Sequence, residues 1–342
     1  MSKISEPLAT RHSQILGVGD YRPSRVIPNS EIVDLIDSSD EWIRERSGIE
    51  SRRYASADES VVDMSVAAAQ KALAAAGITA AQLSAVILAT VTYPFQTPSA
   101  ATDVTLRLGN PNAAAFDISA ACAGFCYGVG MASDMVRTHS AEYVLLIGVE
   151  KLSDFTDPTD RGTAFIFADG AGAIVIGPSD RPKIGPMIWG SDATAREAIV
   201  MQPSWLELRN PNGLTNSGNI GNIGWPDIKM QGQAVFRWAV YQMAPVGLKA
   251  IEAAGITVDQ LDAFIPHQAN TRIIDALAKA MKLPEEIVIA RDVRVSGNTS
   301  AASIPLAMAA LYDSGEVKSG QLALLIGFGA GLVYAAQVVE LP

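Results

Sequence analysis

Cysteine is scarce in this sequence, and no apolar stretch is long enough to cross a membrane. The 342 residues include two cysteines, Cys122 and Cys126, too few for a disulfide framework. The first dozen residues lack the apolar core of a secretory signal, and no run reaches the roughly 20 uncharged apolar residues of a spanning helix. These absences predict a soluble protein of the cytoplasm.

Positive charge is also in short supply. The chain has 26 Lys and Arg residues against 36 Asp and Glu residues, a formal net charge of -10. Nucleic-acid binding rests mainly on basic side chains that neutralise phosphates, so this balance argues against a nucleic acid partner. An acidic partner protein or an anionic ligand would have to meet a local basic patch.

The sequence contains an internal repeat. Residues 71–87, KALAAAGITAAQLSAVI, and residues 249–265, KAIEAAGITVDQLDAFI, are identical at eleven of seventeen positions, with no gap in the alignment. A second pair, 140–148 and 319–327, recurs at nearly the same spacing along the chain. The length also suggests two domain-sized units. We therefore predict two copies of one unit, an N-terminal half over residues 1–180 and a C-terminal half over residues 181–342.

Each copy alternates Ala-rich helical stretches with short apolar runs such as VILATV and LALLIGF. Continuous apolar runs are typical of strands covered on both faces, so the pattern predicts a layered α/β architecture. Ser60, three residues before Asp63, predicts a capping box at the start of a helix, and Gly77 predicts its end.

One region breaks this alternation. Residues 202–227 are rich in Asn, Gly and Pro, with Trp205 and Trp225 isolated among them. We predict a long loop, either a functional flap or a tolerated surface insertion.

The three histidines allow every Cys/His pair to be considered. His12 and His139 lie in polar segments and are expected to be solvated. His267 follows the apolar run LDAFIP, so it is placed at the C-terminal end of a strand, where open α/β sheets hold their ligands. A purely structural histidine is the alternative.

Cys122 is the candidate nucleophile. It lies in FDISAACAGFCYG, where a strand gives way to small residues and then a helix, so we expect the helix N-terminus to lower its pKa below about 8.5. Cys126, one helical turn later in an apolar helix, is predicted to be core. Two cysteines without a neighbouring histidine make a poor zinc site, so no metal is expected.

Asn298 lies in SGNTSAASIP, another strand-to-helix junction, near the position in the second copy that Cys122 occupies in the first. A helix N-cap is the alternative for this residue. The Gly-rich stretch IGFGAGLVYAA runs into a strand, unlike a nucleotide-binding loop. Its turn from Phe328 to Gly331 can present backbone N–H groups to an oxyanion, although a structural hairpin is the alternative.

These segments together resemble the ketoacyl-acyl carrier protein synthase III (KAS III) family of actinobacterial type, the initiating condensing enzymes of dissociated fatty acid synthesis. The motifs that carry the resemblance span nearly the whole chain: SSDEWIRERSGIESRR, DISAACAGF, DPTDRGTAFIFADGAGA, PHQANTRI, GNTSAASIP and GFGAG. The resemblance implies a thiolase-like α/β fold, with two pseudo-repeated halves in a five-layered αβαβα arrangement, and a homodimer.

The resemblance also implies a reaction. An acyl-CoA primer and malonyl-acyl carrier protein would undergo decarboxylative Claisen condensation through an acyl-Cys122 intermediate, giving 3-ketoacyl-acyl carrier protein, CoA and CO2. Backbone N–H groups of Cys122 and Ala330 would hold the oxyanion. His267 and Asn298 would stabilise the malonyl enolate. No cofactor is implied, because acyl-CoA is a substrate.

Binding residues follow from the same resemblance. Trp42 and Arg161 would sandwich the adenine of CoA. The rest of the CoA route would be lined by Ser38, Arg46, Gly232, Phe236, Ala269 and Asn270. The acyl pocket would be lined by Thr97, Leu152, Phe167 and Phe328. A basic patch for the acidic carrier protein would consist of Arg237, Arg272 and Lys279.

One departure from the family pattern bears on substrate choice. Thr97 stands where acetyl-specific members carry a bulky aromatic residue, which predicts a roomier pocket for branched or longer primers.

A degradative thiolase is excluded, because GFGAGLVYAA lacks a second catalytic cysteine. The alternatives that stay open are a KAS III-like acyltransferase, a polyketide starter-unit priming enzyme, a non-catalytic acyl-CoA or carrier-protein binding module, and a Cys/His amidase.

Overall fold

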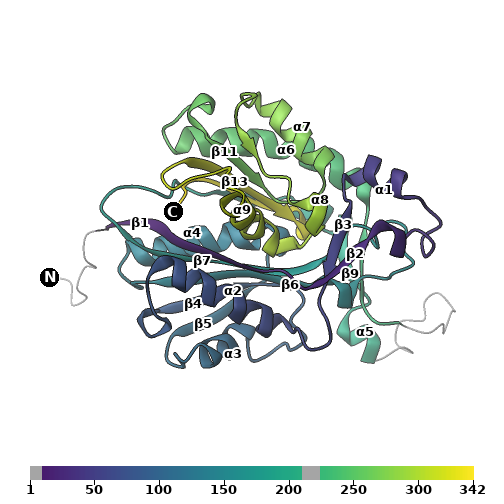
Figure 1. The fold of residues 1–342 in the computed structure, drawn as a ribbon, viewed down its shortest axis with the longest axis horizontal. Helices are drawn as coiled ribbons and strands as arrows, with labels where there is room; N and C mark the ends of the chain where they lie inside the picture. Colours follow the sequence, from purple (N-terminus) through teal and green to yellow (C-terminus); the bar gives the residue numbers. More distant parts are fainter. Residues whose placement is uncertain (1–9, 210–223) are drawn as a thin grey trace.

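The computed structural model describes residues 10–209 and 224–342. Within these ranges the chain forms two five-stranded sheets (Figure 1). The strand order of the first sheet is β1 (His12–Tyr21), β7 (Asp169–Ser179), β6 (Val144–Lys151), β4 (Ala85–Ala89) and β5 (Ala114–Ile118). The order of the second is β8 (Ile188–Ser191), β14 (Val333–Glu340), β13 (Leu322–Gly329), β11 (Ala263–Pro266) and β12 (Val288–Ile289).

The two sheets have the same topology. β6 runs antiparallel to β7 and parallel to β4, just as β13 runs antiparallel to β14 and parallel to β11. The repeated sequence segments lead into equivalent strands, and each contains the same short 3-10 helix with a capping box, Thr79 with Gln82 in one and Thr257 with Gln260 in the other. The sequence repeat is therefore a repeat of a whole sheet.

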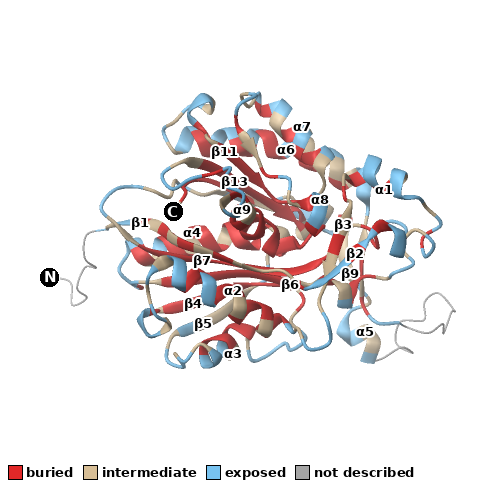
Figure 2. Ribbon diagram, in the orientation of Figure 1, coloured by how far each residue is buried: buried red, intermediate tan, exposed pale blue. Residues whose placement is uncertain are grey.

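Helices complete five layers (Figure 1). α4 (Gly124–Arg137) and α9 (Ser303–Asp313) lie between the sheets and share one core with strands of both. α2 (Val61–Ala76) and α3 (Ala100–Arg107) cover the outer face of the first sheet, and α6 (Gly232–Ala253) and α7 (Thr271–Met281) cover that of the second. Buried residues concentrate in the strands and central helices (Figure 2). The predicted αβαβα arrangement is confirmed.

The local predictions for helix and strand are also confirmed. Ser60 caps α2 in a capping box with Asp63, and Gly77 ends the helix with a left-handed φ of 67°. Every residue of β4 is buried, as expected for a strand covered on both faces. The apolar run therefore identified a central strand.

The remaining elements flank the sheets. The short strands and helices are β2 (Arg25–Pro28) paired with β3 (Ser51–Tyr54), β9 (Ile199–Gln202) paired with β10 (Asp227–Met230), α1 (Asp40–Ser47), α5 (Trp205–Arg209) and α8 (Val293–Ser296). The 3-10 helices are η1 (Asn29–Glu31), η2 (Ala80–Gln82), η3 (Ala121–Ala123), η4 (Leu152–Phe155), η5 (Ala193–Ala198), η7 (Val258–Gln260), η8 (Ser300–Ala302) and η9 (Ala330–Leu332).

The bounds of the loop predicted over residues 202–227 agree with the structure, because β9 ends at Gln202 and β10 begins at Asp227, but a short helix follows the first end. β9 and β10 pair across it, and Trp205 begins the short helix α5. Trp205 and Trp225 are not isolated, because their rings meet edge to face at 5.7 Å and Trp225 stacks on Phe155 at 5.8 Å. Aromatic packing therefore orders these ends, while residues 210–223 lie outside the described residues.

Candidate active site

A cavity of about 730 Å³ lies beside η3 and the ends of β11 and β13. The three predicted catalytic residues, Cys122, His267 and Asn298, all line it. The cavity has the size of a small-molecule site. The structure therefore brings together side chains that come from both halves of the sequence.

Cys122 lies in η3, directly before α4. Ala121 before it adopts a left-handed φ of 45°, which aims the turn at the cavity. The predicted lowering of the thiol pKa is wrong for the unliganded chain. Burial raises the pKa of Cys122 to about 12, the negative charge of Glu150 adds to this, and the nearby Ser300 hydroxyl opposes it. Removal of the sulfur from solvent is the largest of these effects.

His267 follows β11, and its backbone N–H donates to the carbonyl of Ile326 on β13 at 2.8 Å. Its Nδ1 atom lies 2.8 Å from the Ser303 hydroxyl at the start of α9. Burial lowers the pKa of His267 to about 3, so the ring is neutral at physiological pH. With Nδ1 engaged, Nε2 is the ring nitrogen left for a ligand.

Both backbone polar groups of Asn298 form hydrogen bonds. Its N–H donates to Ile166 at 2.9 Å, and its carbonyl accepts from Ala168 at 2.9 Å. Its Oδ1 accepts from the backbone N–H of Ser300 at 2.9 Å. Thr299, the residue directly before η8, makes no side-chain capping bond, so the Asn298 side chain supplies the hydrogen bond at the start of this helix and also has the structural role of the N-cap alternative. The side-chain NH2 group is therefore the part of Asn298 that can donate to a bound carbonyl.

The Gly-rich turn is a hairpin between β13 and β14, with η9 at its tip, and it presses against the nucleophile. A Cβ atom added at Gly329 would lie 2.8 Å from the backbone N of Cys122 and 3.0 Å from its sulfur. Only glycine allows this approach. Ala330 follows immediately and also lines the cavity.

A second polar group lies behind the nucleophile, and no sequence motif pointed to it. Glu150 at the end of β6 is fully buried, and its carboxylate accepts a hydrogen bond from the Ser300 hydroxyl at 3.1 Å. Ser300 also lines the cavity. Its left-handed φ of 48° matches the 45° of Ala121, which precedes it by nearly the spacing of the sequence repeat, so the two halves use the same turn at the site.

Trp42 and Arg161, the residues predicted to hold the adenine of CoA, both line the cavity wall. The guanidinium carbon of Arg161 lies 4.8 Å from the centre of the Trp42 ring, and that of Arg46 lies 5.7 Å from it. Phe165 supports the indole edge to face at 5.2 Å. The three side chains around the indole form a platform that suits a flat, electron-rich ring.

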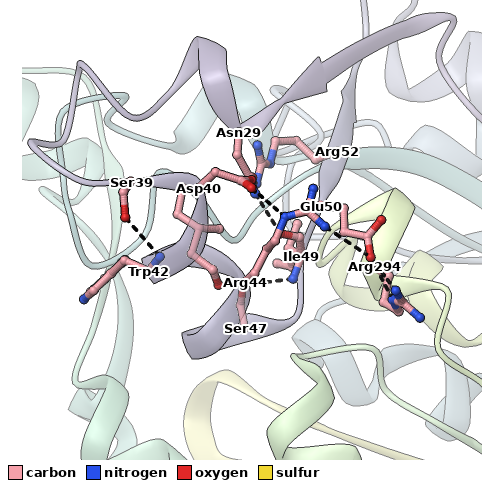
Figure 3. A network of polar contacts seen from close by, with 11 residues as sticks. Asn29, Ser39, Asp40, Trp42, Arg44, Ser47, Ile49, Glu50, Arg52 and Arg294 are labelled. Carbon is pink, nitrogen blue, oxygen red and sulfur yellow. Dashed lines mark hydrogen bonds and ion pairs between the residues drawn. The ribbon is translucent and has the colours of Figure 1, made fainter.

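A buried arginine fixes the helix that carries Trp42. Arg52 donates to Asn29 Oδ1 at 2.7 Å, and Asn29 Nδ2 donates to Asp40 Oδ1 at 2.6 Å (Figure 3). Ser39 caps α1 by accepting from the Trp42 N–H at 3.1 Å. Burial lowers the pKa of Arg52 to about 10, so the guanidinium stays charged at neutral pH. This network holds the indole in place.

Most of the remaining predicted CoA residues line the cavity, namely Gly232, Phe236, Ala269 and Asn270. Ser38 does not, because its hydroxyl is buried in the turn before α1. Asn270 caps α7 by accepting from the N–H of Ile273 at 2.9 Å, so its side chain has a structural role as well.

Most, but not all, of the residues predicted to line the acyl pocket line the cavity. Leu152, Phe167 and Phe328 line the cavity, whereas Thr97 is exposed and lies outside the lining of the single chain. Further apolar lining residues, which the sequence did not single out, are Ile199, Met201, Ile228, Met230, Trp238 and Leu332. They come from β9, β10, α6 and η9, so the apolar wall belongs mainly to the second half.

The predicted basic patch is only partly assembled. Arg237 on α6 and Arg272 on α7 are exposed and contribute to the cavity lining, and Arg272 lies over the ring of Phe236 at 5.2 Å. Lys279 is exposed but does not line the cavity, because it lies two turns further along α7. Of the three residues of the predicted patch, the cavity lining therefore includes two.

The other candidate residues lie elsewhere. Cys126 is fully buried in α4, which confirms the prediction that it is core. His12 and His139 are exposed and outside the cavity lining.

Within residues 10–209 and 224–342, no group of three or more acidic, His or Cys side chains could hold a metal ion. No helix in the same ranges is long and apolar enough to cross a membrane.

Two repeated α/β halves around a Cys, His and Asn site define a thiolase-fold condensing enzyme. Two family models match the chain. The model of 3-oxoacyl-[acyl-carrier-protein] synthase III matches residues 116–193, and that of its C-terminal part matches residues 251–341.

Full-length relatives give the same result. Beta-ketoacyl-[acyl-carrier-protein] synthase III 1 of Streptomyces avermitilis is 56% identical over 356 residues, and its namesake in Streptomyces coelicolor is 57% identical over 344 residues. Both alignments cover 100% of each chain. The protein belongs to the beta-ketoacyl-[acyl-carrier-protein] synthase III family. It is an acyltransferase, an initiating condensing enzyme of fatty acid or polyketide synthesis.

Solved structures share the fold. The priming beta-ketosynthase from the R1128 polyketide biosynthetic pathway superimposes with a TM-score of 0.94 at 44% identity, covering 100% of this chain and 99% of the other. The 3-oxoacyl-(acyl carrier protein) synthase III of Pseudomonas aeruginosa gives a TM-score of 0.87 at 35% identity, covering 97% and 99%.

Proposed function

We propose that the protein condenses an acyl-CoA primer with malonyl-acyl carrier protein through an acyl-Cys122 intermediate. The observation that carries the proposal is the shared cavity in which Cys122, His267 and Asn298 meet. The products are 3-ketoacyl-acyl carrier protein, CoA and CO2. No metal or organic cofactor takes part in the proposed steps.

In the first half-reaction, Cys122 attacks the thioester carbon of the primer. The backbone N–H groups of Cys122 and Ala330 stabilise the oxyanion, which is supported by the close approach of the Gly329 turn to the thiol. CoA then leaves as a thiolate. The acyl chain lies along the apolar wall that includes Leu152 and Phe167.

In the second half-reaction, the malonyl thioester carbonyl accepts hydrogen bonds from His267 Nε2 and Asn298 Nδ2. Loss of CO2 leaves an enolate, and two neutral donors stabilise its oxygen without first protonating it. The neutral state of His267, whose pKa lies at about 3, supports this role. The enolate carbon attacks the acyl group and releases Cys122.

The nucleotide end of CoA stacks on Trp42 against Arg161, and the pantetheine arm passes Arg46, Gly232, Phe236 and Asn270 toward Cys122. The two exposed arginines at the mouth, Arg237 and Arg272, receive the acidic carrier protein. No ion pair within the described ranges ties either arginine to an acidic side chain, which supports this role.

The proposal includes a homodimer and a cytoplasmic location. Thr97 is exposed and outside the cavity of its own chain, so its predicted place in the acyl pocket requires a second copy that delivers it.

The matching strand orders support a division of each chain into residues 1–180 and 181–342. Both cysteines are free thiols, in keeping with a reducing compartment.

The test is intact-protein mass spectrometry after mixing with acetyl-CoA, butyryl-CoA and isobutyryl-CoA. Wild type and Cys126→Ala should each gain one acyl mass, and Cys122→Ala should gain none. An acylated protein should then yield ketoacyl product with malonyl-acyl carrier protein. Absence of any adduct would favour a non-catalytic binding module, and release of free acid would favour an amidase.

A second candidate function is the priming of polyketide synthesis. The R1128 priming beta-ketosynthase, at 44% identity and a TM-score of 0.94, favours it. The two functions share chemistry and differ in the carrier protein. Paired assays with malonyl-loaded carrier proteins of fatty acid and polyketide type would separate them, because the native partner should give the lower KM.

A further inference from the structure

Glu150 is a buried acid at the pocket end of β6, and the steps described above do not use it. Its Oε2 accepts hydrogen bonds from Thr92 Oγ1 at 2.8 Å, Val91 N at 3.0 Å and Thr90 Oγ1 at 3.2 Å. Its Oε1 accepts from Ser300 Oγ at 3.1 Å. All four donors are neutral, and the side chain is fully buried. Burial of an acid without a basic partner is unfavourable, so it calls for an explanation.

Ser300 connects this acid to the nucleophile. Its hydroxyl also lies beside the Cys122 thiol, since both residues line the same cavity and the hydroxyl lowers the thiol pKa. Its backbone N–H holds Asn298 Oδ1 at 2.9 Å. A hydroxyl can donate one proton while accepting another, so the chain from Cys122 through Ser300 to Glu150 can carry a proton. The three groups come from η3, η8 and β6, which join the two halves of the molecule.

We propose that Glu150 takes up the proton of the Cys122 thiol through Ser300 and holds it while the enzyme is acylated. The inference rests on the proposed function, because it takes Cys122 as the nucleophile. Glu150 touches neither substrate nor the reacting sulfur. It is therefore a positioning residue that acts through Ser300.

The proton balance is complete. On acylation, the thiol proton moves to Ser300 Oγ as the Ser300 proton moves to Glu150 Oε1, and the sulfur forms its bond to the acyl carbon. CoA leaves as a thiolate and takes a proton from solvent. On condensation, the bond between the acyl carbon and Cys122 breaks, and Glu150 returns its proton through Ser300 to the sulfur. One solvent proton is consumed per turnover, as the overall reaction requires.

The electrostatics suit a group that alternates between two states. Burial raises the pKa of Glu150 to about 7, and its four hydrogen bonds limit the rise. A proton acceptor works best when its pKa lies near the working pH. His267, whose pKa is lowered to about 3, is a poor acceptor for the thiol proton by comparison.

Other ionisable side chains lie on the elements packed against β6, but none hydrogen-bonds Glu150 within the described part of the chain. They are Asp169 from β7, Cys126, Tyr127, Asp134 and Arg137 from α4, and Asp63 and Lys71 from α2. β4 and η8 contribute none. On β6 itself, Lys151 donates to the carbonyl of Ser56 at 2.9 Å. The acid and the thiol are thus the titrating pair joined through Ser300.

The experiment measures the rate of Cys122 alkylation by iodoacetamide against pH, read by intact-protein mass spectrometry. In wild type, the rate should rise about tenfold per pH unit below pH 7 and level off above it, following ionisation of Glu150. In Glu150→Gln this inflection should disappear, and the rate at pH 7.5 should fall at least about tenfold. Glu150→Asp should restore an inflection, because it restores a carboxylate.

Two further variants make the test specific. Ser300→Ala should lose the inflection while keeping Glu150, and alanine fits there because Ala121 adopts the same left-handed φ in the other half. Asp169→Asn is the matched control. Asp169 is also a buried carboxylate, with a pKa raised to about 6, but it accepts from Ser153 and Ala55 and has no link to Ser300. Its variant should keep the inflection.

The outcomes are distinguishable. Acylation of wild type together with an unchanged pH profile in Glu150→Gln would overturn the relay and leave the proposed function standing. If Glu150→Gln fails to fold in a thermal melt, Ser300→Ala carries the same test, and an inflection that survives in it would also overturn the relay. Failure of wild type to gain an acyl group would overturn the proposed function and the relay together.

Discussion

His267 Nδ1 and Ser303 Oγ lie 2.8 Å apart, one at the end of β11 and the other at the first residue of α9. The same hydroxyl accepts from the backbone N–H of Gln268 at 3.3 Å. A hydroxyl that accepts from the backbone is free to donate its own proton to Nδ1, which puts the single proton of a neutral ring on Nε2. An N–H at Nε2 is what stabilisation of an enolate oxygen needs.

Loss of the other enolate donor should separate the two half-reactions. We expect Asn298→Ala to lower condensation by about 10²- to 10³-fold, the usual cost of removing one oxyanion donor. Acylation of Cys122 should persist, because Asn298 acts only in the second step. Product formation and acyl mass are measured on the same sample. Equal loss of both would indicate a structural role, and Asn298→Asp, which also accepts from Ser300 N–H, is the control for folding.

The buried neutral histidine should make the fold sensitive to acid. The pKa of His267 is about 3 in the folded protein and about 6.5 unfolded, so the unfolded state binds more protons below pH 6.5. The stabilisation is fully present above pH 6.5 and is lost as the pH falls toward 3, by about 1.4 kcal/mol per pH unit. Glu150, with its raised pKa, acts in the opposite direction. Urea unfolding of wild type and His267→Gln in matched buffers isolates the histidine, and parallel pH curves would contradict the prediction.

Trp42 should matter only for substrates that carry the nucleotide. Stacking of a base on an aromatic ring is worth about 1–3 kcal/mol, so Trp42→Ala should raise the KM for acyl-CoA by roughly 5- to 150-fold. The KM for an acyl-N-acetylcysteamine thioester, which lacks the adenine, should not change. Trp189→Ala, an exposed tryptophan outside the cavity, is the matched control. A parallel rise for both substrates would point to damage to α1 instead.

The basic mouth should discriminate between the two substrates. Arg272→Glu should raise the KM for malonyl-acyl carrier protein more than that for acyl-CoA, because a reversed charge repels an acidic protein surface. The effect should shrink as salt is added. Lys249→Glu, at the far end of α6, changes the same net charge away from the cavity. Equal losses with both substrates would place Arg272 on the CoA route alone.

Thr97→Phe should narrow primer choice. Wild type should accept branched and longer primers, and the variant should favour acetyl-CoA in matched competition assays, because a phenyl ring would fill the end of the acyl pocket. Since Thr97 lies outside its own cavity, the effect depends on a second copy. Sedimentation measurements report the oligomer in parallel. A strict acetyl preference in wild type would contradict the prediction, as would a functional monomer whose primer choice Thr97→Phe does not change.

Sequence reasoning worked best where the signal is local or repeated. The capping box of Ser60 and Asp63 depends on residues three apart, and the internal repeat translated directly into two sheets with one strand order. Apolar runs marked central strands for the same reason. These features are set by neighbours along the chain, so a single sequence contains them.

The failures have a different physical origin. Glu150 follows the apolar run VLLIGV, but its partner Ser300 lies 150 residues further along the chain, so the sequence does not show the pairing. The pKa of Cys122 depends on how far the folded chain shields the sulfur from water, which raises it. The helix at Trp205 differs, because Ser204 and Glu207 hydrogen-bond each other at its start and lie only three residues apart in the sequence. The Cys122 pKa and the pairing of Glu150 with Ser300 depend on three-dimensional neighbours.

The contact between Trp42 and Arg161 has a consequence for selectivity. At 4.8 Å, the guanidinium already lies over the face of the indole, and a base can enter between them only if the two side chains move apart. Arg161 therefore competes with a ligand for the face of the Trp42 ring. A ligand that displaces it must stack on the indole more favourably than the guanidinium does, and must also offer the displaced guanidinium a negatively charged group. A purine followed by phosphates meets both conditions, whereas an uncharged aromatic meets only the first.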